Sequence, residues 1–175
     1  MPAPPTVLRV SIVDVLNGIA AKLVADAVVP DISLIKWVTP NMVRSQPHLD
    51  AGQDILLCPR GFKADINWTS GSGRRGLLLT RRIDLIPRTR LSLDELGQAI
   101  DWMTSAQGHF VFEEAIVNSL TLFIPQDVNN NQLTACPLHP WSSDDPQKDQ
   151  EDMDWGYATV AFEVRYLLNV NQAVI

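Results

Sequence analysis

Residues 58–93 constrain the fold of this chain more than any other segment. The segment reads CPRGFKADINWTSGSGRRGLLLTRRIDLIPRTRLSL. Apolar runs at 54–58 and 76–86 predict two strands, the first of which is expected to end at Pro59. Between them lies a loop rich in glycine and serine at 69–73, with the composition of a flexible connection. The arrangement predicts a long hairpin, and therefore a mixed or mostly antiparallel sheet.

The same segment gathers arginines in a chain whose formal net charge is −6. A dedicated DNA-binding module is usually positive as a whole, so this charge argues against one. A local cationic surface still suits contacts with carboxylates or phosphates. We therefore expect the protein to be a component of something larger. Its candidate docking residues are Arg74, Arg75, Arg81, Arg82, Arg88 and Arg90.

Length and composition favour one globular domain. The chain has 175 residues, of which 46% are hydrophobic and 19% charged, enough to bury a sizeable core but short for two domains. We expect a single domain over 1–175, with a proline-rich tip at 1–10 and flexible loops at 69–73 and 142–155. The sequence has neither the pattern of a signal peptide nor an apolar stretch near the roughly 20 residues that cross a bilayer. A soluble protein that does not contact membranes is expected.

Periodicity places the remaining elements. The clearest is a strand at 157–170, in which residues from Ala158 to Leu168 alternate between an apolar and a polar face, so that one side is buried. Capping signals predict a helix at 11–27, begun by Ser11 and Asp14, and another from Ser92, with Glu95, to Gly108. The other expected elements are a short strand at 32–38, a loop at 41–50, a helix at 109–121, a surface loop at 125–131 and an edge strand at 133–138. This order predicts an α+β fold: a mixed, mostly antiparallel sheet with a long hairpin and helices packed on one face.

No motif for catalysis, a cofactor or a metal emerges from the sequence. The two cysteines are expected to be reduced packing residues, and the three histidines to be surface or capping residues, because none has metal-ligand spacing or a neighbouring nucleophile. The glycines at 71–76 lack the lysine and the strand-to-helix context of a phosphate loop, and there is no nucleophile elbow. We expect no enzyme, no catalytic residue, no cofactor and no metal.

An acidic stretch and three loop tryptophans complete the candidate interface. The acidic side chains are Asp144, Asp145, Asp149, Glu151, Asp152 and Asp154. They could be a solvated linker, and a calcium or magnesium site is disfavoured because their spacing fits no EF-hand and Pro146 interrupts it. The tryptophans are Trp68, Trp141 and Trp155, which could anchor an interface or pack beneath their own loops.

Four of these patterns together resemble the tail terminator, or tail completion, proteins of long-tailed bacteriophages. They are the opening helix SIVDVLNGIAAKL, the strand ILLCPRG, the arginine-bearing GRRGLLLTRRIDLIPRTRLSLDEL and the closing strand GYATVAFEVRYLLNV. They span most of the chain. The loop DINWTSGSGRR and the acidic SSDDPQKDQEDMD depart from the family pattern.

The resemblance implies a structural virion protein of the tail and neck, assembled in the host cytoplasm. It implies a homohexameric ring that caps the tail tube, stops its polymerisation and offers a head-tail joining surface to the connector. The implied partners are further copies of the chain, the tube protein, the connector and DNA that passes through the channel without sequence-specific binding. Another connector, stopper or neck protein is an alternative, as is an unrelated binding protein or small enzyme. The arginines could face a neighbouring subunit, the tube, DNA or solvent, with the acidic loop as their partner in the first case.

Overall fold

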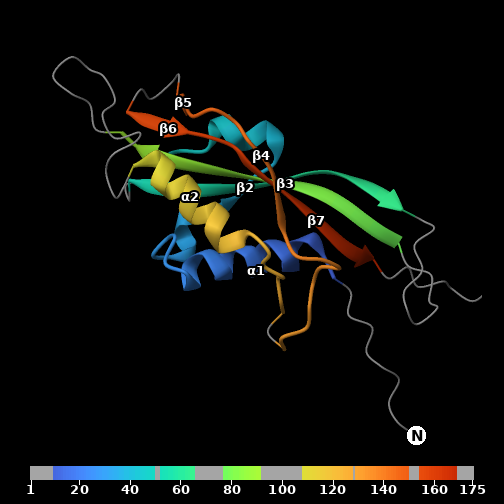
Figure 1. Cartoon of the computed structure of the whole chain (residues 1–175). Helices are drawn as coiled ribbons and strands as arrows, with labels where there is room; N and C mark the ends of the chain where they lie inside the picture. Colours follow the sequence, from blue (N-terminus) through green and yellow to red (C-terminus); the bar gives the residue numbers. More distant parts are fainter. Residues whose placement is uncertain are drawn as a thin grey trace, which may run out of the picture.

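A mixed, mostly antiparallel sheet with two α-helices on one face forms the described part of the chain, which confirms the predicted α+β class (Figure 1). The computed structural model describes residues 10–49, 52–65, 77–91, 108–127, 129–149 and 154–168. The helical elements are α1 (Ile12–Ala25), η1 (Ile32–Leu34), η2 (Pro40–Ser45) and α2 (His109–Leu120). The strands are β1 (Ile35–Trp37), β2 (Gln53–Asp65), β3 (Leu77–Arg90), β4 (His139–Ser143), β5 (Gln147–Lys148), β6 (Trp155–Tyr157) and β7 (Val160–Leu168).

Strand β3 lies at the centre of the sheet. Its one edge pairs with β2, and its other edge pairs with β7 along most of its length and with β6 near its end. Strands β4 and β5 extend the sheet beyond β7 and β6, respectively. The β1–β2 pair is parallel, and every other pair named here is antiparallel.

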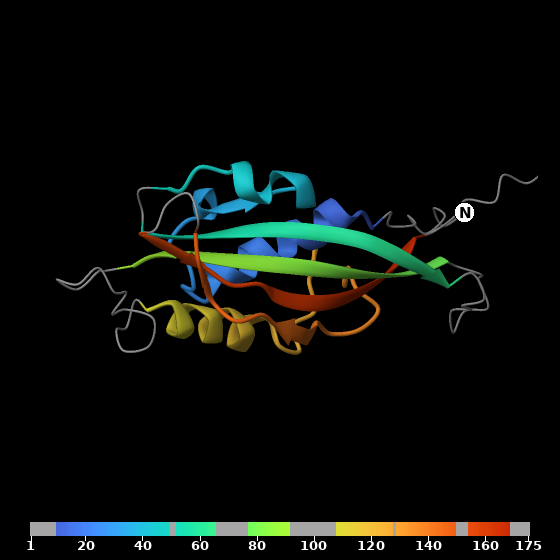
Figure 2. The same cartoon turned by 90° about the horizontal axis from the view of Figure 1, so that it is seen from above.

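The predicted long hairpin is present as β2 and β3, but both strands run further than the sequence predicted. Strand β2 passes through Pro59, where it was expected to end, and a register shift between Pro59 and Phe62 marks a bulge. Strand β1 pairs with β2 only as far as Leu57, so Pro59 lies on an open edge, where a strand tolerates proline. The far ends of both strands extend beyond α1 and α2 (Figures 1 and 2). The loop predicted at 69–73 and the helix predicted from Ser92 lie outside the described residues.

Both α-helices bury an apolar stripe against the sheet. Helix α1 begins at the predicted capping box, in which the Ser11 side chain accepts from the backbone N–H of Asp14 and the Asp14 carboxylate accepts from the Ser11 backbone. Helix α2 occupies nearly the predicted range. Their buried residues form one core with the sheet, and its fully or almost fully buried members include Val15, Ile19, Leu23, Ile116, Leu120, Ile83, Leu85, Val160 and Phe162.

The opposite face of the sheet is covered in a different way. Segment 32–38 is a 3-10 turn followed by the short strand β1, and the segment predicted as a loop at 41–50 contains the 3-10 helix η2. Here Val43 of η2 packs on a small second core of Val38, Leu56, Cys58 and Ile86. Figure 2 shows η2 on the β2 side of this face, with β2, β3 and β7 side by side.

Three predictions for the C-terminal third are corrected. Residues 133–138 are not a strand: the N–H groups of Leu133 and Leu138 donate to the loop carbonyls of Pro125 and Phe123, and the neighbouring strand is β4. The strand predicted at 157–170 is interrupted at 158–159, giving β6 and β7. Segment 142–155, predicted as a flexible loop, holds the end of β4, all of β5 and the start of β6. Long-range pairing with β3 and β7 decides these boundaries, and local sequence does not encode it.

Candidate assembly surfaces

A buried carboxylate lies between two arginines on the sheet face that η2 leaves partly open. Asp84 of β3 is 0% exposed, yet it meets the Nε of Arg60 and the Nε of Arg82 at 2.5 Å each, on different carboxylate oxygens. The side chains of Arg60 and Arg82 are 39% and 36% exposed. A buried carboxylate is stable only with charged or hydrogen-bonding partners, which these guanidinium groups provide. We call Arg60, Asp84 and Arg82 the arginine triad.

The arginine triad borders two further charged side chains and a shallow hollow. Glu163 lies opposite Arg82 in the β3–β7 register and accepts from the Nε of Arg165 at 2.6 Å. A shallow hollow of about 360 Å³ opens between η2 and the sheet, with Asn41, Tyr157 and Arg60 among its lining residues. Arg60 was not among the predicted site residues. The sequence predicts that the first strand of the hairpin ends at Pro59, whereas in the structure Arg60 lies at the bulge of β2 and its side chain contacts Asp84 of β3.

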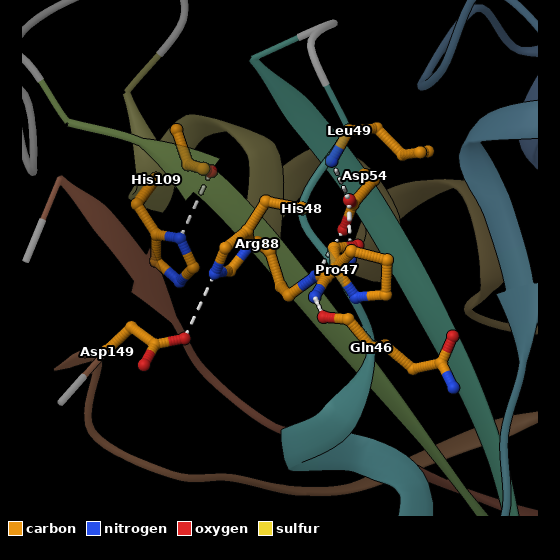
Figure 3. A network of polar contacts seen from close by, with 9 residues as sticks. Gln46, Pro47, His48, Leu49, Asp54, Arg88, His109 and Asp149 are labelled. Atoms are coloured by element: carbon orange, nitrogen blue, oxygen red, sulfur yellow. Dashed lines mark hydrogen bonds and ion pairs between the residues drawn. The ribbon is translucent and has the colours of Figure 1, made fainter. Parts of the chain in front are cut away.

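Arg88, predicted to be a docking residue, instead lies inside the protein (Figure 3). Its guanidinium is paired with Asp54 through two contacts of 2.5 and 2.6 Å, and it also donates to the backbone carbonyls of Gln46 and Pro47. The two paired side chains are 5% and 0% exposed. This pair fastens the segment after η2 to the β2–β3 hairpin, so Arg88 is not available to a partner.

The remaining arginines separate into distinct environments. Arg81 donates from Nη1 to the Arg60 carbonyl at 2.8 Å and lies 5.4 Å from the centre of the Phe62 ring, at the bulge of the hairpin. Arg90 is exposed at the end of β3. Arg74 and Arg75 lie outside the described residues. The arginines predicted to be docking residues therefore do not form one surface, because they differ in burial and in ion pairing.

Trp155 and Asp149 are also held within the chain. Trp155 is 6% exposed and its ring stacks on His48 with 4.3 Å between the centroids. The Nε2 of His48 lies 3.0 Å from the Asp149 carboxylate. Trp155 is therefore buried against a distant segment of the same chain, and its ring is not an exposed anchor for a partner. Trp141 of β4 is 60% exposed and remains a candidate anchor, whereas Trp68 lies outside the described residues.

His109 was expected at the surface or in a capping role and is instead fully buried. It is the first residue of α2, and its Nδ1 lies 3.2 Å from the hydroxyl of Thr89 on β3. Burial disfavours the charged imidazolium and lowers the pKa of His109 to about 4. The cysteines are both free thiols, and burial raises the pKa of Cys58.

An acidic groove lies between α2 and the segment that follows β4. Its volume is about 580 Å³, and it is lined by Glu113, Glu114, Asp144 and Asp145, with no lysine or arginine among the lining residues that the structure describes. Ser143 donates to the Glu113 carboxylate, which joins β4 to α2. The predicted candidates Glu151 and Asp152 lie outside the described residues. Within the described ranges, no group of three or more side chains suits a metal ion.

Comparisons with known proteins leave the family of this chain open. No protein-family model matches it, and no curated protein matches it. Among solved structures, it is similar to a chain in the virion of a native gene transfer agent particle, with 17% sequence identity and a TM-score of 0.46. The alignment covers 85% of this chain and 91% of the other. Among the described residues, no helix is long and apolar enough to cross a membrane.

Proposed function

We propose that this protein is a structural virion component, the tail terminator ring that caps the tail tube and joins it to the head-side connector. One observation carries the proposal: a single subunit presents a half-exposed arginine cluster on one surface and an acidic groove on another. Unlike surfaces that complement each other favour head-to-tail contacts, which close into rings when the rotation permits. The four sequence patterns that resemble tail terminators support the same role.

The proposed partners follow from that role. Copies of the chain contact one another around the ring, which we propose to be a hexamer. One face of the ring occupies the last polymerising surface of the tube, and the other meets the connector. DNA passes through the channel without base-specific contacts. The described ranges contain no group of three or more side chains that could hold a metal ion, and the proposal requires neither chemistry nor a cofactor.

The native mass of the purified protein tests this function. We expect a closed ring, either in isolation or after mixing with the tube protein, measured by native mass spectrometry and seen on negatively stained grids. A monomer under both conditions would contradict the proposal. Particles that lack the protein distinguish the alternative neck role: a terminator predicts overlong or unstable tails, whereas a connector or stopper predicts normal tails that fail to join filled heads.

A further inference from the structure

The arginine triad has an unbalanced charge at its surface. Asp84 offsets only one of its two guanidinium charges, and it lies beneath them, fully buried. Each guanidinium reaches Asp84 through Nε, and among the described residues its two Nη groups make no hydrogen bond. Two half-exposed guanidinium groups fixed on one buried carboxylate form a preorganised site for a further oxyanion, because little side-chain freedom remains to be lost.

The local charge favours a carboxylate over nucleic acid. Around the triad, Arg165 adds one positive charge and Glu163 removes one, so the five side chains carry a single net positive charge. Binding to a DNA backbone depends on neutralising several phosphates at once. One positive charge with directed N–H donors instead matches one or two carboxylates.

The chain itself offers such carboxylates. Asp144 and Asp145 are exposed beside two further acidic residues in the acidic groove. The N–H of Asp144 is bonded to the Thr159 carbonyl at 3.0 Å, which fixes the segment to the end of β7. Within the described part of a single chain, neither aspartate forms an ion pair with an arginine. The two surfaces are therefore complementary in charge, and within the described ranges of one chain they do not contact each other.

We propose that the arginine triad is the socket that receives Asp144 and Asp145 of a second copy of this chain. This inference rests on the proposed ring, and it assigns the contact that would join neighbouring subunits. Arg60 and Arg82 donate hydrogen bonds from their Nη groups to the incoming carboxylates, while Asp84 holds both guanidinium groups in place. The contact is head-to-tail, because the socket and the acidic segment are different surfaces of the same subunit.

Complementary defective subunits test the contact. Arg60→Gln removes half of the socket and leaves Arg82 to pair with Asp84, whereas Asp144→Asn with Asp145→Asn removes the incoming charge at exposed positions. We expect each variant alone to associate at least about tenfold more weakly than the wild type by sedimentation velocity. Mixed in equal amounts, the two variants should form heterodimers and nothing larger, since only one of the two junctions is intact. Lys63→Gln, which removes an exposed charge from the same strand, is the matched control and should assemble normally.

The outcomes separate this inference from the proposed function. If wild type and all variants form the same ring, the ring stands and the assigned contact is wrong. If Arg60→Gln fails to fold, the aspartate variant decides the matter alone, because normal assembly without its charges contradicts the contact. A wild-type protein that stays monomeric both in isolation and after mixing with the tube protein overturns both proposals. Binding of double-stranded DNA by such a monomer, lost in Arg60→Gln, would identify phosphate as the ligand instead.

Discussion

Two buried carboxylates on neighbouring strands, Asp54 and Asp84, differ in how exposed their arginine partners are. Asp54 and Arg88 face each other in the β2–β3 register, are both buried, and satisfy each other within the protein. Asp84 is equally buried, but its arginine partners keep more than a third of their side-chain surface exposed. Charge reversal at Arg82 would place a second carboxylate against Asp84, so it would disturb folding as well as any interface. Mutations of Arg60 or of the acidic segment separate these effects better.

Truncation of Phe162 is expected to cost a large part of the free energy of unfolding. Phe162 is 0% exposed near the start of β7, among residues from both α-helices and the sheet. Phe162→Ala should lower the free energy of unfolding by about 3 to 5 kcal/mol through lost burial and the cavity that remains. Chemical denaturation measures this change. Phe62→Ala is the matched control: Phe62 is 58% exposed, so a comparable loss there would contradict the assigned faces of the sheet.

His109 should make the stability depend on pH. Its pKa is about 4 in the folded protein, against about 6.5 for an unperturbed histidine. The unfolded chain therefore binds the proton more readily, and stability falls as the pH falls from about 6.5 towards about 4. Between pH 7.5 and 4.5 this group alone should remove about 2 to 3 kcal/mol of unfolding free energy.

The contribution of His109 can be isolated by substitution. Denaturant unfolding at several pH values should show a shallower dependence in His109→Gln than in the wild type. His139→Gln serves as the control, because His139 is exposed on β4. Equal pH dependence in wild type and His109→Gln would show that the imidazole titrates normally.

At the scale of single elements, helix α1 is specified almost entirely by its own residues. Its capping box, its apolar stripe and its boundaries all follow from nearby sequence. The strands differ, because how far a strand extends depends on where another strand pairs with it. Strand β2 continues past Pro59 since β3 still pairs with it there, and β4 appears at Pro140 because β7 offers a partner.

The cap of α1 provides a prediction at this scale. Ser11→Ala removes the acceptor for the Asp14 N–H and should cost about 1 kcal/mol of unfolding free energy. Ser11→Thr retains a hydroxyl and should cost a few tenths at most. Thermal unfolding of the two variants measures the difference. Equal melting temperatures would mean that packing of the apolar stripe, and not the cap, fixes the start of the helix.

At the scale of the whole molecule, the two faces of the sheet are covered by different elements. In the part of the chain that the structure describes, the α-helices cover one face, while η2 covers the β1–β2 side of the other (Figure 2). The open remainder carries the arginine triad, and the acidic groove lies beside α2. This division gives the described part of the chain one surface with arginine side chains and another with acidic side chains.

Salt should therefore weaken the proposed assembly more than the fold. Exposed ion pairs are screened once the Debye length falls from about 14 Å near 0.05 M to a few ångströms near 0.5 M. We expect sedimentation to show a lower association constant over that range, while the melting temperature changes little, because the Arg88–Asp54 pair is buried. Association that strengthens with salt would instead indicate an apolar contact, for which Trp141 and Phe62 are two of the exposed candidates.

The sequence by itself determined the α+β class, both described α-helices, the long hairpin and the buried face of β7. Each rests on local information: capping residues, helical periodicity or strict alternation. Segment 92–107 and the loop at 69–73 remain predictions from the same kind of signal.

Only the tertiary structure decided which charged residues are available for contacts. Arg82 and Arg88 stand on the same strand with similar neighbours, yet one is half exposed and the other fastens an internal segment. Arg60 belongs to the arginine triad because it contacts Asp84 on the partner strand. Trp155 is not available to a partner because it stacks on His48, which is far away in the sequence. The physical reason is that burial and ion pairing depend on long-range register, which local pattern does not contain.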